Sequence, residues 1–175
     1  MTSPAYGNFE TFISHVESPA LRTVAQCWHE ARGAKRMPSW ADLPSCALLP
    51  YSKLLWGFAY DPKTGEFTGR LAGNRLSKWV GENFYGGRLE DLHARANYGE
   101  SQQLLTKTVT TPLAGRSSGR LFSAGGFVVT GERIVLPLAE DGDTGNGILG
   151  ASDYAPPPLL GPVEMVHENV EWYSI

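Results

Sequence analysis

Two groups of strand-like segments, separated by a helical stretch, constrain the fold of this chain more than any other feature. The first group is a hairpin, in which residues 53–60 form a strand, residues 61–65 form a turn and residues 66–72 return. Bulky and small side chains alternate from Trp56 to Tyr60. Three further strands are predicted at residues 120–130, 132–139 and 147–153. Strands at both ends with helices between them favour an α+β fold, here a five-stranded antiparallel sheet with helices on one face.

The segment between the two groups is predicted to be mostly helical. Residues 98–109 show an apolar side at helical spacing, and Pro112 ends that helix. A shorter helix is expected around residues 76–80. The glycine- and serine-rich residues 115–119 are expected to form a loop, and Gly131 is expected to form the turn after the following strand.

A helical extension is predicted ahead of the sheet. Ser18 before Pro19 is a typical helix start, since serine caps the first turn and proline fits its first position. Apolar residues recur at helical spacing as far as Arg32, and a second stripe covers residues 9–16. Because a monomer rarely exposes so much apolar surface, we expect a homodimer here, the alternative being that both stripes fold onto their own domain. The dimer-interface candidates are Phe12, Val16, Leu21, Val24 and Trp28.

Four motifs follow one another between residues 18 and 153. They are Arg36-Met37-Pro38, Ser39-Trp40 leading to Leu49-Pro50, Gly69-Arg70-Leu71-Ala72-Gly73, and Leu136-Pro137-Leu138 followed by Ile148-Leu149-Gly150. In this order they resemble the single-domain PAS proteins common in alphaproteobacteria. One departure is Gly69, where that family often has an aromatic residue, and a glycine there leaves space in the core or for a neighbouring segment.

The resemblance implies a PAS-like fold in three parts: an N-terminal helical extension and proline-rich lead-in at residues 1–50, a PAS-like core at 51–155 and a C-terminal tail at 156–175. It also implies a stand-alone sensory or regulatory domain that signals through an unknown partner protein, with or without a small ligand in its core. Two alternatives stay open. One is a small-molecule receptor whose ligand is essential, and the other is a small α+β enzyme with Arg70 or His93 as its titratable group.

Aromatic residues are numerous for a domain of this size, and they either fill the core or line a pocket between sheet and helices. Arg70 interrupts an otherwise uncharged stretch, so an inward-pointing side chain would need a partner or an anionic ligand. The ligand-pocket candidates are Trp56, Phe58, Arg70, Trp79, Phe84 and Phe127.

No haem, flavin or metal is predicted, although an unidentified small ligand remains compatible with the sequence. Residues 98–109 contain no histidine, where haem-binding PAS proteins usually hold their axial ligand. Cys27 and Cys46 precede the middle region in which flavin-binding PAS proteins carry their reactive cysteine. His93 is interpreted as structural, and no serine, histidine and acid form a recognisable catalytic arrangement, so an enzyme is not expected.

The charge pattern excludes some partners. The net charge is -3, with acidic and basic residues mixed along the chain, so no basic face for nucleic acid is expected. No apolar run approaches the roughly 20 residues needed to span a bilayer. Two cysteines and the absence of a signal-peptide pattern favour a reducing cytoplasm.

Overall fold

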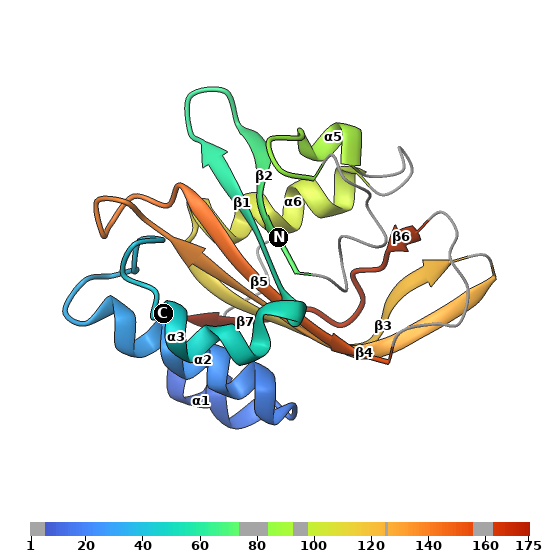
Figure 1. The fold of residues 1–175 in the computed structure, drawn as a ribbon, viewed down its shortest axis with the longest axis horizontal. Helices are drawn as coiled ribbons and strands as arrows, with labels where there is room; N and C mark the ends of the chain where they lie inside the picture. The colour runs from blue at the N-terminus through green and yellow to red at the C-terminus, as the bar shows by residue number, and fades with distance from the viewer. Residues whose placement is uncertain (1–5, 74–83, 93–97, 125, 156–162) are drawn as a thin grey trace.

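An antiparallel sheet forms the centre of the computed structural model, which describes residues 6–73, 84–92, 98–124, 126–155 and 163–175 (Figure 1). Its strands lie side by side in the order β2-β1-β5-β4-β3. The predicted α+β class and the five antiparallel strands are therefore confirmed. The strands are β1 (Leu55–Asp61), β2 (Glu66–Ala72), β3 (Leu113–Ala124), β4 (Phe127–Leu138) and β5 (Gly147–Tyr154).

Two short strands from the tail extend this sheet to seven strands, two more than predicted. Both β6 (Val163–Met165) and β7 (Glu171–Ser174) pair with β3 in antiparallel register. Phe122 lies opposite Met165, and Gly115 lies opposite Trp172. The described part of the tail therefore folds onto its own domain.

The β3–β4 hairpin differs from its prediction. Residues 115–119 belong to β3 rather than to a loop, and Gly131 lies inside β4, opposite Tyr154 of β5. The reversal comes earlier, between Ala124 and Phe127, and Gly126 there has a φ of 85° that favours glycine. Residues 115–119 lack an alternating apolar pattern, so the sequence predicted a loop. They form a strand because β4 and β7 bond this part of β3 from its two sides.

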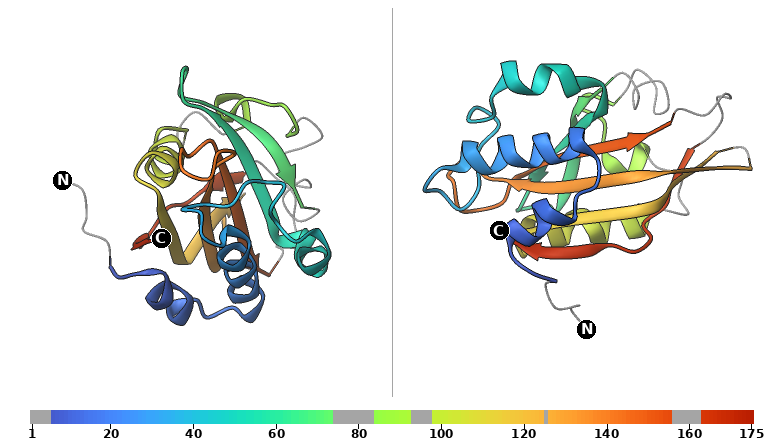
Figure 2. Two further views of the ribbon diagram at one scale, coloured as in Figure 1. Left: turned by 90° about the vertical axis from the view of Figure 1, so that its left-hand side faces the viewer. Right: turned by 90° about the horizontal axis from the view of Figure 1, so that it is seen from below.

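Helices cover both faces of the sheet (Figures 1 and 2). The helical middle supplies α5 (Leu89–Leu92) and α6 (Tyr98–Thr110) on one face, as predicted. The N-terminal extension covers the other face, so the expectation of helices on one face holds only for the core. Its elements are α1 (Phe9–His15), α2 (Pro19–Arg32), α3 (Ser45–Leu48) and the 3-10 helix η1 (Leu49–Leu54). The predicted short helix at residues 76–80 lies outside the described residues.

Helix α2 begins as its sequence predicts. The hydroxyl of Ser18 accepts a hydrogen bond from the backbone N–H of Leu21 at 3.2 Å, and Pro19 occupies the first helical position. The Trp28 indole N–H donates to the backbone oxygen of Pro137 on β4 at 2.8 Å. This bond satisfies the polar atom of a side chain that is otherwise packed into the core.

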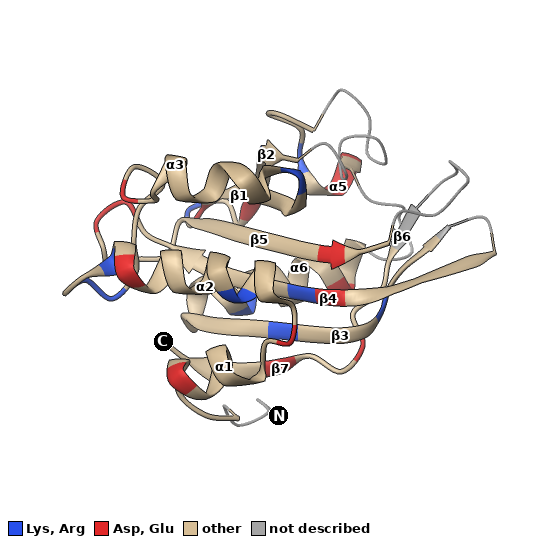
Figure 3. Cartoon of the chain, turned by 60° about the horizontal axis from the view of Figure 1, so that its bottom comes forward, with Lys and Arg blue, Asp and Glu red and all other residues tan. Residues whose placement is uncertain are grey.

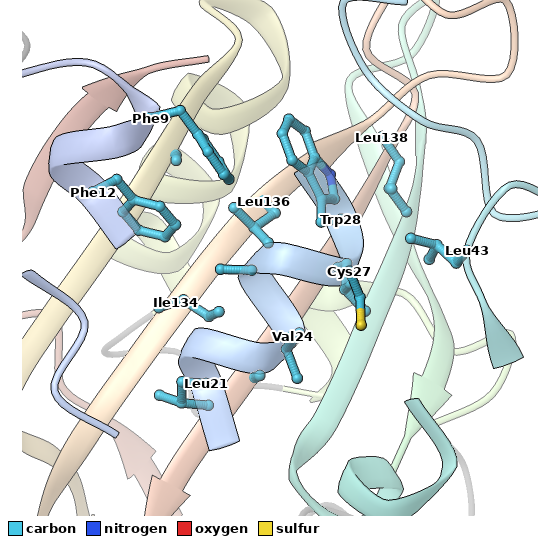
Figure 4. Packing of buried hydrophobic residues seen from close by; sticks show 14 of the residues in the cluster. Phe9, Phe12, Leu21, Val24, Cys27, Trp28, Leu43, Ile134, Leu136 and Leu138 are labelled. Atoms are coloured by element: carbon cyan, nitrogen blue, oxygen red, sulfur yellow. The ribbon is translucent and has the colours of Figure 1, made fainter. Parts of the chain in front are cut away.

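The predicted dimer interface is wrong at the level of its residues. All five candidates are 0% exposed because α1 and α2 pack their apolar stripes against the sheet of their own chain (Figure 4). The alternative, that both stripes fold onto the same domain, is correct. The homodimer itself stays a prediction. The buried candidates are Phe12, Val16, Leu21, Val24 and Trp28.

Candidate functional site

The aromatic residues predicted to line a pocket form part of a core beneath α5 and α6. Trp56, Phe58 and Phe84 are almost fully buried, and the ring centroid of Phe58 lies 6.0 Å from that of Trp56 and 5.1 Å from that of Phe84. Phe67, which the sequence argument did not select, joins the same cluster. Gly69 gives the segment 84–87 room: the Gly86 N–H donates to its carbonyl oxygen at 2.8 Å, and the Gly69 N–H donates to Gly87.

The other predicted pocket residues lie elsewhere. Arg70 is exposed on the opposite face of the sheet, with its guanidinium carbon 5.1 Å from the centre of the Trp40 ring. Phe127 is 47% exposed at the end of the β3–β4 hairpin, so its assignment to a pocket between sheet and helices is wrong. Trp79 and His93 lie outside the described residues.

Two hollows open on the described surface. Neither is lined by any of the predicted pocket residues. One, of about 280 Å³, lies between α6 and the C-terminal segment and is lined by Glu100, Gln103, Leu104, Lys107, His167, Val170 and Trp172. The other, of about 240 Å³, lies on the opposite face and is lined by Trp40, Leu43, Ser45, Leu48, Leu49, Ser52, Leu55, Leu71 and Leu149.

Arg133 on β4 is a fully buried cation that the sequence argument missed. Its guanidinium donates to the carbonyl oxygens of Leu121 at 3.0 Å and Val166 at 3.2 Å, and its Nε lies 3.4 Å from the hydroxyl of Ser152. Burial lowers the pKa of Arg133 to about 10, so it stays charged at neutral pH. The Glu132-Arg133 pair inside a strand of apolar residues was the signal that could have revealed it.

A serine and a histidine meet beside the first hollow. Ser101 Oγ lies 2.7 Å from His167 Nε2, and Arg133 Nη1 lies 3.4 Å from His167 Nδ1. A guanidinium only donates, so this contact favours the tautomer in which Nδ1 accepts and Nε2 carries the ring proton, facing Ser101. A histidine in this tautomer donates to the hydroxyl instead of removing its proton.

A second buried arginine links the two ends of the chain. Arg116 on β3 bonds Glu132 at 2.7 Å and Glu171 at 3.0 Å. Glu132 also accepts hydrogen bonds from the backbone N–H groups of Glu17 and Ser18, just before α2. Figure 3 shows this meeting of basic and acidic segments where β3, β4 and β7 run past the beginning of α2. The network therefore joins the N-terminal helices, the sheet and the tail.

Tyr173 and Glu171 complete this network. The Tyr173 hydroxyl donates to Glu171 at 2.8 Å and lies 2.7 Å from His15 Nδ1. Burial raises the pKa of the phenol, and its hydrogen bond to Glu171 acts in the same direction. Burial opposes ionisation of Glu171, but the hydrogen bonds from Tyr173 and Arg116 outweigh it and lower the pKa of the carboxyl.

The described residues contain no group of three or more histidine, cysteine or acidic side chains able to hold a metal ion. Cys27 is buried within α2, and burial raises the pKa of its thiol, whereas Cys46 is exposed on α3. In the part of the chain that the structure describes, no helix is long and apolar enough to cross a membrane.

The strand order and the aromatic core define a class of small α+β domains in which one antiparallel sheet carries a helical layer between its second and third strands. The family model of the PAS domain matches residues 16–152, and the chain therefore belongs to the PAS domain family. The membership indicates a sensory or regulatory role. Searches of curated proteins and of solved structures found no match. The strands β6 and β7 lie outside the matched residues.

Proposed function

We propose that this chain is a cytoplasmic sensory or regulatory PAS module that acts through contact with another protein and has no catalytic activity of its own. The family membership supports the regulatory role. The contact between Arg133 and His167 Nδ1, which favours the tautomer that donates to Ser101, supports the non-catalytic part. The observation that carries the interaction is an exposed apolar tip on the β3–β4 hairpin.

The tip consists of Phe127 and Val128, which are 47% and 53% exposed. In Figures 1 and 2 the β3–β4 hairpin reaches beyond the rest of the sheet, so its end stands clear of both helical layers. A small buried cluster that includes Leu121, Phe122 and Val129 supports the hairpin from within. Adjacent apolar side chains on a supported, projecting hairpin are suited to enter a groove on a partner protein.

Site-specific photocrosslinking in cells of the native host tests this proposal. A photoreactive phenylalanine analogue in place of Phe127 should give one discrete crosslinked product, and the additional change Val128→Glu should abolish it. The same analogue in place of Lys63, exposed in the turn between β1 and β2, is the matched control and should give no product. Products that are equal at both positions, or that survive Val128→Glu, would overturn the proposal.

The mass of the product distinguishes the partners. A product at twice the 19.1 kDa of the chain identifies a homodimer through the hairpin tip, a surface different from the buried helical stripes. A product of another mass identifies a separate signalling protein.

A small-molecule receptor is the second candidate function, and the apolar hollow on the α3 side of the sheet favours it. A ligand there would have to bind one conformation of the domain better than another in order to change its contacts.

A further inference from the structure

A β-bulge in β2 changes which side chains face the α3 side of the sheet. Gly57 of β1 pairs with Leu71, whereas the next residue, Phe58, pairs with Gly69, so Arg70 is an extra residue without a partner in the ladder. Side chains of a regular strand alternate between faces, but a bulge breaks this alternation and redirects a side chain. Arg70 and Leu71 accordingly both reach the α3 side, the first over Trp40 and the second into the hollow.

The hollow beside this bulge is apolar. Leucines from α3, η1, β1, β2 and β5 line most of it, and Leu49 at this site is 70% exposed. Its aromatic wall is Trp40, whose indole comes close to the sheet at Gly57 and Gly147, where no side chains stand in the way. A Cβ at Gly57 would lie 2.9 Å from Trp40 Cζ2, and one at Gly147 would lie 3.0 Å from Nε1. The sequence thus keeps a space in which an apolar group can contact leucine and tryptophan side chains.

The charge next to the hollow is uncompensated. Arg88, Arg116 and Arg120 each bond a glutamate, but Arg70 has no acidic side chain within ion-pair distance among the described residues. Its guanidinium lies against an aromatic face and is held by a cation–π contact, while its N–H groups make no hydrogen bond to a described residue. Such a guanidinium can bind a carboxylate with two parallel hydrogen bonds.

We propose that this hollow binds a small hydrophobic carboxylate, with its apolar part among the leucines and its carboxylate at Arg70. The volume of about 240 Å³ is below the roughly 300–1,000 Å³ of pockets for drug-sized ligands, so the ligand is a short acid. The site lies on the face of the sheet opposite the Trp56–Phe58–Phe84 cluster. The proposal does not depend on the hairpin tip or on any signalling role.

Isothermal titration calorimetry of the full chain with sodium octanoate and with octanol tests both parts of the proposal. Octanoate should bind at a single site and roughly tenfold more tightly than octanol, because a hydrogen bond to a charged group adds that much. Arg70→Gln should reduce octanoate binding to the level of octanol while leaving octanol binding unchanged. Lys63→Gln removes another exposed cation, one that forms no ion pair with a described acidic side chain. It is the matched control and should bind octanoate like the unmodified chain.

Filling the hollow tests the apolar part. Leu71→Trp should abolish binding of both compounds, and Ser52→Trp, at an exposed position of the lining, should do the same without disturbing the core. The melting temperature of each variant shows whether it is folded. No saturable binding of octanoate to the unmodified chain, or binding that survives Ser52→Trp in a folded variant, overturns the site. Equal affinities for octanoate and octanol in the unmodified chain overturn the role of Arg70.

Discussion

Two segments near the ends of the chain are held to the same sheet by different physical means: the N-terminal helices, and the stretch that precedes the buried Trp172 and Tyr173. The N-terminal helices α1 and α2 bury Phe12, Leu21 and Trp28 completely against β4 and its neighbours. The C-terminal link, which we define as residues 163–171, has no buried side chain among those described. It is held instead by buried arginines and by hydrogen bonds, with Arg133 bonded to Val166 and Arg116 bonded to Glu171.

This difference predicts how each end responds to conditions. Burial of apolar surface depends little on salt or pH, whereas ion pairs weaken with ionic strength and with protonation of their acids. Segments with few buried apolar contacts also open at a lower free energy than the core. The N-terminal helices should therefore unfold only with the whole domain, and the C-terminal link should open on its own.

The largest expected effect is that of Trp28→Ala. Removing this fully buried indole should lower the free energy of unfolding by about 3–5 kcal/mol, as large-to-small core substitutions do. Urea unfolding followed by circular dichroism measures the loss. Tyr85→Ala, at an 82% exposed aromatic residue, is the control and should change stability little. A loss for Trp28→Ala below about 1 kcal/mol would show that α2 is not part of the cooperative unit.

A smaller and local effect is expected for Arg133→Met. The carbonyl oxygen of Val166 loses its Arg133 donor, and a group left unsatisfied costs about 1–3 kcal/mol, whereas that of Leu121 keeps its hydrogen bond from the Val166 N–H. A buried charge is removed at the same time. The net change in global stability should therefore be less than for Trp28→Ala.

Hydrogen exchange locates the consequence of Arg133→Met. Amides of residues 163–167 should exchange faster, while those of α2 keep their protection. Faster exchange in α2 as well would contradict the independence of the two ends. Arg36→Met, at an exposed arginine, is the control and should leave the exchange of residues 163–167 unchanged.

Local signals explain which parts of the fold could be predicted from the sequence. The Ser18-Pro19 start of α2 and the strand over residues 66–72 depend on neighbouring residues, and both were predicted. The position of the β3–β4 turn was not, because pairing with β5 and β7 rather than local composition decides which residues of this hairpin are strand. Periodicity also identifies an apolar stripe without indicating what covers it, which explains why the interface residues on α1 and α2 were misassigned.

The candidate sites were predictable only in their chemistry. Arg70 was singled out as a charge in need of an explanation, but the bulge that sends it to the face of Trp40 depends on the register between β1 and β2. Arg133 was missed because a charged residue in a strand is usually solvated, and only the assembled sheet and tail bury it.

Lowering the pH should weaken the attachment of the C-terminal link, because it protonates Glu171. Its folded-state pKa lies below its ordinary value, so ionised Glu171 stabilises the fold fully above that ordinary value. The contribution is lost as the pH falls through the lower, folded-state pKa. Because Glu171 is partly exposed, Glu171→Gln should cost only about 1 kcal/mol or less at neutral pH.

Hydrogen exchange measured against pH should show the C-terminal link opening in acid before α2. In Glu171→Gln, acid should no longer promote opening of the C-terminal link relative to α2, because the carboxylate that loses its charge is absent. Opening of α2 first would contradict the proposed difference between the two ends.

The smallest expected effect is that of Asp42→Asn, in a hydrogen-bonded turn just after the N-terminal helices. Asp42 accepts hydrogen bonds from Lys35 Nζ at 2.7 Å and from the backbone N–H of Ser39 at 2.8 Å, closing the turn that carries Trp40. These bonds lower the pKa of its carboxyl to about 2, the bond to Lys35 contributing most. The stabilisation is therefore present above the ordinary pKa of 3.8 and disappears as the pH falls toward 2.

A carboxyl titration followed by NMR should find a pKa of about 2 for Asp42. The substitution Asp42→Asn should leave the urea midpoint nearly unchanged while it alters the resonances of Trp40. A pKa near 3.8 would show that the turn is open in solution, and the apolar hollow beside Trp40 would then lack its fixed wall.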